Sequence, residues 1–553
     1  SCCVFMQDFI YRNRHWWGAL TLLVATVGIY YQTDRYLDVE FSDESYYMQC
    51  GLELFDKLTL HWGPTYNLWY KLLSLFTDNP INLYYISFAL TGAMVPLLLY
   101  WLLLRWRIPF VIACWISFCF MTSEQHVTTF ARVTHFAVLL FLLSLIISTY
   151  LRSKTVKMAL VLGGCLLASY ARPELTFGLI LMLIFYGWQW FRKRKQVQGK
   201  THYVLLIFGG IVVVNMALSS WNSFELFGYK RDIIAFYDHY TLKMNMQKND
   251  YAYWEYWDDI AEKYFGGKKQ FTDVLTAYPK EVLRHVFFNM VLYVILLAKW
   301  TGNFILPFAL TEEWNGFLYV AVVCLLSAIL LVVWLPARRN RFKVLLQQHS
   351  ENLIILALFG LPSLLACALI FPRFHYIYQQ LPFFLLLLAI LLQSLLPDKQ
   401  MIAERLKIPA LLLLLTVVLA GSPRIYRYDQ FYIFKTYHET KPYSLCYKQL
   451  IPFLNQHEPE RKHVLFSNVF MSHIFLNKNY EVRNPMLHKR MNVRFDEFME
   501  KEGVDVILLN HQMYTDSHLY TDSTWTHFIQ HYEDFGFRKI RVSADCDLEV
   551  LVK

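Results

Sequence analysis

The sequence is informative first through the motifs that it lacks. No Asn-X-Ser/Thr sequon occurs in any expected external loop, which argues against residence in the endoplasmic reticulum. Its 10 cysteines show no metal-like spacing, and residues 422–553 contain no glycine-rich phosphate loop and no serine-nucleophile elbow. No internal repeat stands out, which weakens the case for an inverted-repeat transporter. These absences disfavour the common nucleotide-binding, zinc and serine-hydrolase chemistries.

Long apolar segments are the most prominent feature that the sequence does have. The chain of 553 residues is 56% hydrophobic and 17% aromatic, whereas a soluble protein is about 45–50% apolar. Several apolar runs fall in windows long enough to cross a bilayer, and they lack the period-two alternation of a membrane barrel. The clearest runs are 95–104, 136–147, 353–370, 383–396 and 411–419. This composition predicts a polytopic α-helical membrane protein.

The net charge of +9 is interpreted as a sign of membrane topology, not of nucleic-acid binding. The basic residues gather in short clusters between apolar segments, and the clusters recur at every second loop. Under the positive-inside rule they mark cytoplasmic loops, which makes the N-terminus cytoplasmic and the C-terminus external. The clusters are Arg12/Arg14, Arg105/Arg107, Arg152/Lys154/Lys157, Arg192–Lys195 and Arg338–Lys343.

Alternating these clusters with the apolar runs predicts about eleven spans within residues 1–421, with external loops at about 32–81 and 221–314. The first span, Trp16–Tyr31, lacks a small-residue cleavage site and is predicted to be retained. Residues 286–310 are apolar, but counting them as a span would place Arg338–Lys343 outside. We therefore predict that they lie at the outer interface or re-enter the membrane. The other spans are expected near 82–104, 108–122, 133–151, 157–171, 174–191, 203–220, 315–335, 352–371, 376–396 and 408–421.

Residues 422–553 are predicted to form a small extracytoplasmic α/β domain. Polar helical segments such as Val493–Glu502 separate short apolar runs that predict strands. Cys446 and Cys546 lie in this region, and they could pair if it faces an oxidising compartment. The predicted strands are His463–Phe466, Asp505–Leu509, Arg538–Val542 and Leu548–Val552.

An acidic cluster directly follows the first span, where carboxylates often mark function. A carboxylate at an external membrane edge, here Asp43 or Glu44, can act as a general base on a hydroxyl or an amine. The alternative is that Asp43 and Glu44 only charge the first turn of a helix that Ser42 caps. Asp38 and Glu40 add the option of a divalent cation site.

Arginines at external span ends form the second candidate group. Arg373 can hold a phosphate bidentately and His375 can donate one more hydrogen bond. Arg132 and Arg172 also fall at external span ends, where the positive-inside rule disfavours arginine. Each one alone is explained equally well by an interfacial side chain reaching the lipid headgroups, but three together predict an anionic partner.

Three motifs resemble the GT-C superfamily of integral-membrane glycosyltransferases. The closest pattern is the branch with the protein O-mannosyltransferases and the bacterial lipid A aminoarabinose transferases. The motifs are SDESYYMQCGLEL at 42–54, HWGPTYNLW at 61–69 and RFHYIYQQLP at 373–382. The sequence departs from that family at Gly63-Pro64, where Pro-Pro is usual, and at Arg373-Phe374, where Arg-Tyr is frequent. The resemblance covers the layout of the whole membrane region but only some thirty residues in motifs.

The resemblance implies an inverting sugar transfer from a polyprenyl-phosphate donor to a lipid, glycan or protein acceptor. Asp43 would be the base and Glu44 would orient the acceptor or share that role. Arg373, His375, Arg132 and Arg172 would bind the donor phosphate. No metal is required on this account, although Asp38 and Glu40 keep a metal possible. Contacts to donor or acceptor are expected from Tyr46, His61, Trp62 and Tyr376, and the aromatics of residues 251–257 could cover the acceptor.

The setting implied is a bacterial cytoplasmic membrane, with the site and the C-terminal domain facing the periplasm. Two alternatives stay open. One is a transporter or flippase of a lipid-linked or anionic substrate, although such a protein should carry ionisable residues near the middle of the membrane. The other is an oligosaccharide polymerase or ligase that uses a diphosphate-linked donor.

Overall fold

The structure is a computed structural model that describes most of the chain, with gaps between residues 306 and 335 and between 396 and 445 as the longest. The described residues are 14–30, 34, 38–39, 43–55, 63–123, 126, 132–193, 200–221, 225–226, 229–248, 257–305, 336–395, 446–469, 474–510, 513–514, 516–542, 546 and 548–553. The predicted spans near 315–335 and 408–421 lie outside this set, so their number remains a prediction.

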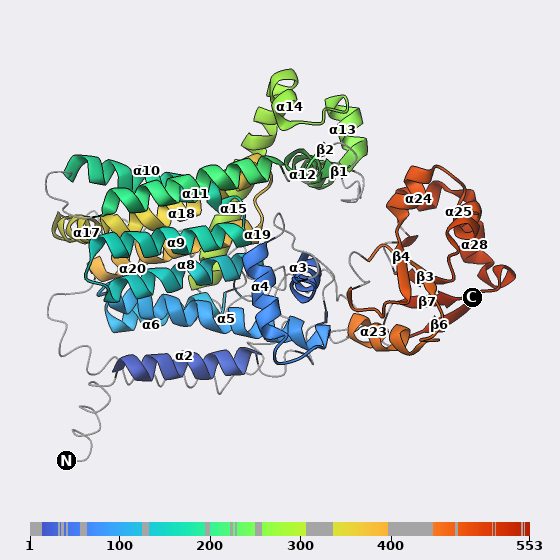
Figure 1. The fold of residues 1–553 in the computed structure, drawn as a ribbon, viewed down its shortest axis with the longest axis horizontal. Coiled ribbons are helices and arrows are strands. Elements are labelled where there is room, and N and C mark those ends of the chain that lie inside the picture. Colours follow the sequence, from blue (N-terminus) through green and yellow to red (C-terminus); the bar gives the residue numbers. More distant parts are fainter. Residues whose placement is uncertain are drawn as a thin grey trace, which may run out of the picture.

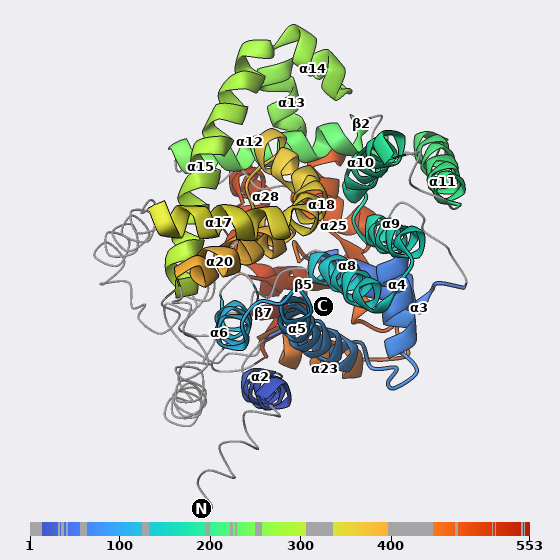
Figure 2. The same ribbon diagram turned by 90° about the vertical axis from the view of Figure 1, so that its left-hand side faces the viewer.

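A bundle of long apolar helices forms the larger part of the molecule (Figure 1). Within the described residues, seven helices are long and apolar enough to cross a membrane, and three shorter apolar helices accompany them. Figure 2 looks along the bundle, so that α5, α6, α8 and α9 are seen end-on. The long helices are α5 (Pro80–Arg105), α8 (Val133–Tyr150), α9 (Lys154–Ala171), α10 (Leu175–Lys193), α11 (Thr201–Trp221), α15 (Pro279–Ile305) and α18 (Ser350–Leu369). The shorter ones are α2 (Arg14–Tyr30), α6 (Phe110–Met121) and α20 (Leu381–Leu395). This architecture is that of a helical membrane protein, as the sequence predicts.

Local capping residues explain where two of the spans begin. The Asn79 side chain accepts the backbone N–H of Ile81 at 2.9 Å, and Pro80 follows at the first helical position of α5. Ser153 caps α9 in the same way and accepts the N–H of Val156 at 3.4 Å. Such caps satisfy N–H groups that have no partner inside the helix.

The predicted interfacial or re-entrant segment, residues 286–310, is described up to Ile305. Residues 286–305 belong to the 27-residue helix α15, which begins at Pro279 and is long and apolar enough to cross a membrane. Near its start His285 contacts the backbone oxygen of Ile370 at 2.8 Å, and further on Asn289 donates to Ala368 O at 3.0 Å. The helix therefore runs antiparallel to α18 from the end at which α18 finishes. The argument against a span here was that one more crossing would place Arg338–Lys343 outside. That argument assumes a span at residues 315–335, which the structure does not describe.

Short helices gather at one end of the bundle. They come from the two long loops and from the turn between α18 and α20; in Figure 1, α3, α12 and α19 lie between the bundle and the C-terminal domain, and α13 and α14 project above them. They are α3 (Asp43–Leu52), α4 (Pro64–Leu73), α12 (Arg231–Lys248), α13 (Trp257–Phe265), α14 (Phe271–Ala277) and α19 (Phe374–Tyr378). The basic helix α17 (Pro336–Gln348) lies at the other end, because Arg338 Nη1 donates to Ser394 O at 3.4 Å near the end of α20.

The tyrosines of α4 point inward and not toward the membrane surface. The side chains of Tyr66 and Tyr70 are fully buried, whereas those of Leu68 and Leu72 are exposed. Tyr66 and Tyr70 turn inward because their hydroxyls donate to the buried Glu44 carboxylate.

The C-terminal part contains a five-stranded mixed sheet in the order β4-β3-β5-β7-β6. The two pairings of β3 are parallel and the two pairings of β7 are antiparallel. The strands are β3 (His463–Phe466), β4 (Tyr480–Arg483), β5 (Val506–Leu509), β6 (Arg538–Arg541) and β7 (Glu549–Val552). Four of them match predicted strands within one residue at each end, and β4 is an addition. The predicted pairing of Cys446 and Cys546 is also confirmed, as a disulfide with Cα atoms 5.5 Å apart.

Both faces of this sheet are covered. Successive side chains of a strand point to opposite faces, and Val506 and Leu508 pack into one apolar cluster while Ile507 and Leu509 pack into another. The first cluster includes α23 (Cys446–Gln456), and the second includes α25 (Phe495–Glu502) and α28 (Ser523–Gln530). A strand with no polar side chain, such as β5, fits a sheet that is buried on both sides.

Two helical glycines provide a matched test of the packing between α3 and α4. A Cβ atom on Gly51 would lie 2.6 Å from Asn67 O and 2.6 Å from Tyr70 Cβ, whereas one on Gly209 in α11 would meet nothing within 4 Å. We expect Gly51→Ala to lower the unfolding free energy by about 1–3 kcal/mol, as overpacking does. Gly209→Ala should leave it unchanged or raise it by up to about 1 kcal/mol. Thermal unfolding in detergent checks both, and equal midpoints for the two variants would contradict this packing.

Candidate functional site

The two adjacent acids at the start of α3 point in different directions. Asp43 is exposed, whereas Glu44 is only 3% exposed. Successive residues of an α-helix are about 100° apart around its axis, so one carboxylate faces the outside of the bundle end while the other faces the interior. Asp43 and Glu44 are therefore adjacent in sequence but have different surroundings.

Glu44 is a buried carboxylate with several hydrogen-bond donors. Its Oε1 atom accepts the hydroxyls of Tyr66 and Tyr70, and its Oε2 atom accepts the backbone N–H of Arg132 at 2.7 Å. Burial raises the pKa of Glu44, and the hydrogen bonds from the two tyrosines and from Arg132 oppose that rise. These contacts join α3, α4 and the start of α8. They give Glu44 a structural role, and its expected contact with an acceptor stays a prediction.

Arg132 also lies in the interior, not at the surface where the sequence places a phosphate ligand. Its side chain is 1% exposed, Nη1 donates to His126 O at 2.7 Å, and the guanidinium stands 3.9 Å from the Phe88 ring centroid. His126 in turn contacts the Tyr378 hydroxyl through Nδ1 at 2.9 Å. To contact Arg132, as the sequence predicts, the phosphate of the sugar donor would thus have to enter a closely packed polar cluster.

Arg373 is the charged centre of the outer site. It stands directly before α19, in the turn between α18 and α20, and its side chain is half-buried. Burial lowers the pKa of Arg373, while the Tyr376 hydroxyl and the carboxylates of Asp43 and Asp238 raise it. Two acids from different external loops therefore lie within electrostatic reach of one guanidinium.

Asp238 is the site residue that sequence reasoning missed. It belongs to α12, whose buried face is formed by Ile233, Phe236, Tyr237 and Tyr240. Asp238 is half-buried, and its Oδ1 atom has no hydrogen-bond partner among the described residues. Burial raises the pKa of Asp238 to about 8, with Arg373 opposing and Asp258 and Asp43 adding to the rise. The sequence signal that could have identified Asp238 was an acid placed between Tyr237 and Tyr240 in a helix. Nothing in the sequence, however, places α12 beside Arg373.

The second predicted phosphate ligand, Arg172, already has an acidic partner. Its Nη2 atom lies 2.6 Å from Glu174 Oε1, which also accepts Gln379 Nε2 at 3.2 Å. The guanidinium stands 5.3 Å from the Tyr376 ring centroid. The Arg172 guanidinium therefore already has a carboxylate in direct contact.

The remaining predicted residues divide into three groups. His375 and Tyr376 do lie beside Arg373 and Arg172, and burial together with these cations lowers the pKa of His375 far below its usual value. Tyr46 lies near Cys50 and Glu53, whereas Tyr47 approaches Arg172. Glu40, His61, Trp62 and residues 249–256 lie outside the described part of the chain.

Asp38 contacts the C-terminal domain. Its two carboxylate oxygens accept the backbone N–H groups of Tyr447 and Lys448, each at 2.9 Å, in the first turn of α23. Burial raises the pKa of Asp38 to about 6 against these hydrogen bonds. Among the described residues there is no group of three or more His, Cys, Asp or Glu side chains that could hold a metal ion. A divalent metal therefore stays an untested option.

The glycine at position 63 has a local physical reason. Gly63 has φ of +59° and precedes Pro64, the first residue of α4. A Cβ atom at position 63 would lie 2.5 Å from Tyr47 Cε1. Proline fixes φ near −65°, so a second proline could not adopt this backbone conformation, and glycine can.

The fold and the site define a polytopic helical membrane protein with a charged site at one end of its bundle. No protein-family model matches the sequence, and no curated protein matches it either. The site itself combines an exposed carboxylate, a half-buried protonatable carboxyl and a half-buried arginine. Such a group can bind an anion and accept a proton from a neighbouring nucleophile.

The elevated pKa of Asp238 predicts a pH-dependent stability. The folded protein keeps this proton up to about pH 8, whereas an aspartic acid in the unfolded chain has its ordinary pKa of about 4 and releases it there. The contribution of this group to the unfolding free energy is therefore full below about pH 4 and decreases as the pH rises toward 8. We expect Asp238→Asn to remove that decrease.

Thermal unfolding in detergent between pH 5 and pH 9 measures this difference. Asp232→Asn is the matched control, because Asp232 is exposed in the first turn of the same helix. If the wild type and Asp238→Asn change in parallel over this range, the assigned environment of Asp238 is wrong.

Proposed function

We propose that this protein is an inverting glycosyltransferase that uses a polyprenyl-phosphate sugar. The proposal depends on one observation, the convergence of Asp43 and Asp238 on Arg373 at one end of a membrane bundle. A lipid-linked phosphate needs a cation at the membrane edge, and an attacking hydroxyl or amine needs a base nearby. Both are provided here by residues that the structure brings together from distant parts of the chain.

The transfer forms one bond and breaks one. The acceptor oxygen or nitrogen attacks the anomeric carbon of the sugar while Asp43 takes its proton. The bond between that carbon and the phosphate oxygen breaks, and the electron pair leaves with the lipid phosphate. Arg373 stabilises the negative charge that grows on the leaving group, with His375 and Tyr376 beside it. The configuration at the anomeric carbon is inverted because attack and departure occur on opposite faces.

Two features support an external, periplasmic position of the site in a cytoplasmic membrane. The basic helix α17 lies at the bundle end opposite to Arg373, as the positive-inside rule requires of a cytoplasmic segment. The Cys446–Cys546 disulfide in the C-terminal domain fits an oxidising compartment. The acceptor can be a lipid, a glycan or a protein.

Two substitutions separate the proposed roles. Asp43→Asn removes the base, so turnover should fall at least about 100-fold while the affinity for the donor stays within about twofold. Arg373→Ala removes a charged phosphate contact, so donor affinity should fall roughly 10- to 100-fold and turnover should fall with it. Glu53→Gln is the control, since Glu53 is an exposed acid just beyond the end of α3.

The measurement uses purified protein in nanodiscs with a panel of polyprenyl-phosphate and polyprenyl-diphosphate sugars. Ligand-induced thermal stabilisation reports binding, and release of lipid phosphate reports turnover. Wild-type turnover in both Asp43→Asn and Arg373→Ala would contradict the site assignment. Response only to diphosphate-linked oligosaccharides would indicate a polymerase or ligase, and binding without turnover of any donor would favour a transporter or flippase.

A further inference from the structure

The C-terminal domain contacts both of the external loops that carry the site's carboxylates. Figure 1 shows this domain beside the bundle end at which α3, α12 and α19 lie. One contact involves Asp38, five positions before Asp43, and the other involves α13, the helix that follows α12 and Asp238. The first contact consists of hydrogen bonds to a helix N-terminus, and the second consists of ion pairs.

The first contact is a helix N-terminus that receives a carboxylate. Asp38 accepts the N–H groups of Tyr447 and Lys448, and Lys448 Nζ lies 3.1 Å from Asp34 Oδ2. The same ammonium stands 5.2 Å from the Tyr85 ring centroid at the start of α5. A carboxylate at this position satisfies otherwise unpaired N–H groups and interacts favourably with the helix dipole. The chain just before Asp43 is thereby fixed to α23.

The second contact is a group of ion pairs between α24 (Pro485–Met491) and α13. Lys489 Nζ lies 2.5 Å from Asp259 Oδ2 and 3.6 Å from Asp258 Oδ1, and Arg490 Nη2 lies 4.0 Å from Asp258 Oδ2. The lysine side chain is 20% exposed and that of Asp258 is 30% exposed. Partial burial reduces solvent screening, so a network of this kind is stronger than an isolated surface pair.

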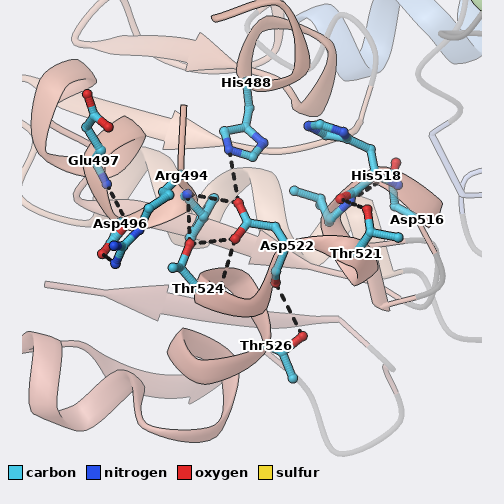
Figure 3. Close-up of polar contacts among 12 residues, drawn as sticks. His488, Arg494, Asp496, Glu497, Asp516, His518, Thr521, Asp522, Thr524 and Thr526 are labelled. Atoms are coloured by element: carbon cyan, nitrogen blue, oxygen red, sulfur yellow. Dashed lines mark hydrogen bonds and ion pairs between the residues drawn. The ribbon is translucent and has the colours of Figure 1, made fainter. Parts of the chain in front are cut away.

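Each contact helix is firmly attached to its own domain. The disulfide joins Cys446 at the start of α23 to Cys546. In α24, the buried His488 lies 3.5 Å from Asp522 Oδ2 (Figure 3). Asp522 also accepts the N–H of Phe495 at 2.9 Å and that of Thr524 at 2.8 Å. His488, next to Lys489, is thus buried beside the carboxylate that caps α28 and accepts the first N–H of α25.

The helix α13 is in turn attached to α12. Phe265 packs against Phe236, Tyr237 and Tyr240 with ring centroids 5.0–5.5 Å apart. These aromatic residues flank Asp238 in the sequence of α12. Asp258 is also close enough to Asp238 to contribute to its raised pKa. A change at the ion pairs of α24 can therefore reach Asp238 through one packed helix pair.

We propose that the C-terminal domain is a clamp that joins the two external loops, through Asp38 at α23 and through Lys489 and Arg490 at α13. The clamp sets the position of Asp238 relative to Asp43 and Arg373. Lys489 is a positioning residue in this scheme, because it acts through α13 and α12. The proposal rests on the proposed function only for its effect on turnover, and the structural coupling can be tested without any substrate.

Hydrogen exchange of full-length protein in nanodiscs tests the clamp by charge reversal and rescue. Lys489→Glu places three like charges together, so we expect exchange in residues 231–248 and 257–265 to become about tenfold faster. The double variant Lys489→Glu with Asp259→Lys restores an ion pair and should return exchange to within about twofold of the wild type. Lys539→Glu is the matched control, because Lys539 pairs with Glu549 at 2.7 Å within the sheet and away from α13.

The outcomes of this exchange experiment are distinct. Faster exchange in Lys489→Glu that the double variant reverses, with no change in Lys539→Glu, supports the clamp. Unchanged exchange in Lys489→Glu overturns it, and so does faster exchange that the double variant fails to reverse. The exchange experiment needs no substrate, so it decides the clamp even if the wild-type protein turns over no donor. The absence of turnover with every donor would refute the transferase proposal alone.

Turnover separates positioning of Asp238 from a purely structural role of Lys489. Only positioning predicts that kcat falls while the KM for the donor stays the same. With an active donor in hand, Lys489→Glu should lower kcat about tenfold and leave the KM for the donor within about twofold, because Arg373 remains in place. The double variant should recover kcat. A rise in donor KM without a fall in kcat would contradict positioning of Asp238.

Discussion

The external end of this protein depends on one buried carboxylate. Glu44 lies inside the bundle, where an ionised group without partners would be strongly unfavourable. It is accommodated because two tyrosine hydroxyls and the backbone N–H of Arg132 all donate to it. These donors come from α4 and from the start of α8, so a single side chain fixes the position of α3 against two other elements. The absence of a Cβ at Gly51 permits the close approach that these hydrogen bonds need.

This constraint determines what the neighbouring residue can do. With Glu44 fixed inward, the helix geometry turns Asp43 outward to the side where Arg373 and Asp238 lie. The site is then assembled from α3, α12 and the turn before α19, none of which is adjacent in sequence to another. Within it, Arg172 has Glu174 in direct contact, and the carboxylates of Asp43 and Asp238 both act electrostatically on Arg373. A guanidinium at the membrane edge suits a ligand that carries a negative charge.

Local patterns made much of the architecture predictable from the sequence. Apolar length identified the long helices, and alternation of short apolar runs identified four strands of the C-terminal sheet, including β3 at its observed bounds. The pairing of Cys446 with Cys546 was an option that depended on an oxidising compartment, and the structure contains this disulfide. The proximity of His375 and Tyr376 to Arg373 also followed from their closeness in sequence.

What the sequence could not provide were contacts between distant segments. Asp238 lies 135 positions from Arg373 and 195 from Asp43 in the numbering, and no pattern links α12 to either. Residue type also misled: Arg132 at a span end indicated a surface cation, but it packs on Phe88 in the interior. Asp38 indicated a cation ligand, yet it meets the first turn of α23 more than 400 positions away. The prediction for residues 286–310 came from a parity argument, whereas by length and composition α15 is a candidate span.

A double-mutant cycle on Glu44 and Tyr70 tests the central claim most directly. The unfolding free energies of the wild type, Glu44→Gln, Tyr70→Phe and the double variant would be measured in mixed micelles. If the carboxylate holds α3 on α4 through this hydrogen bond, the two changes are coupled by about 1–3 kcal/mol. Additivity within about 0.5 kcal/mol would mean that Glu44 does not fix α3, and the outward direction of Asp43 would lose its physical basis.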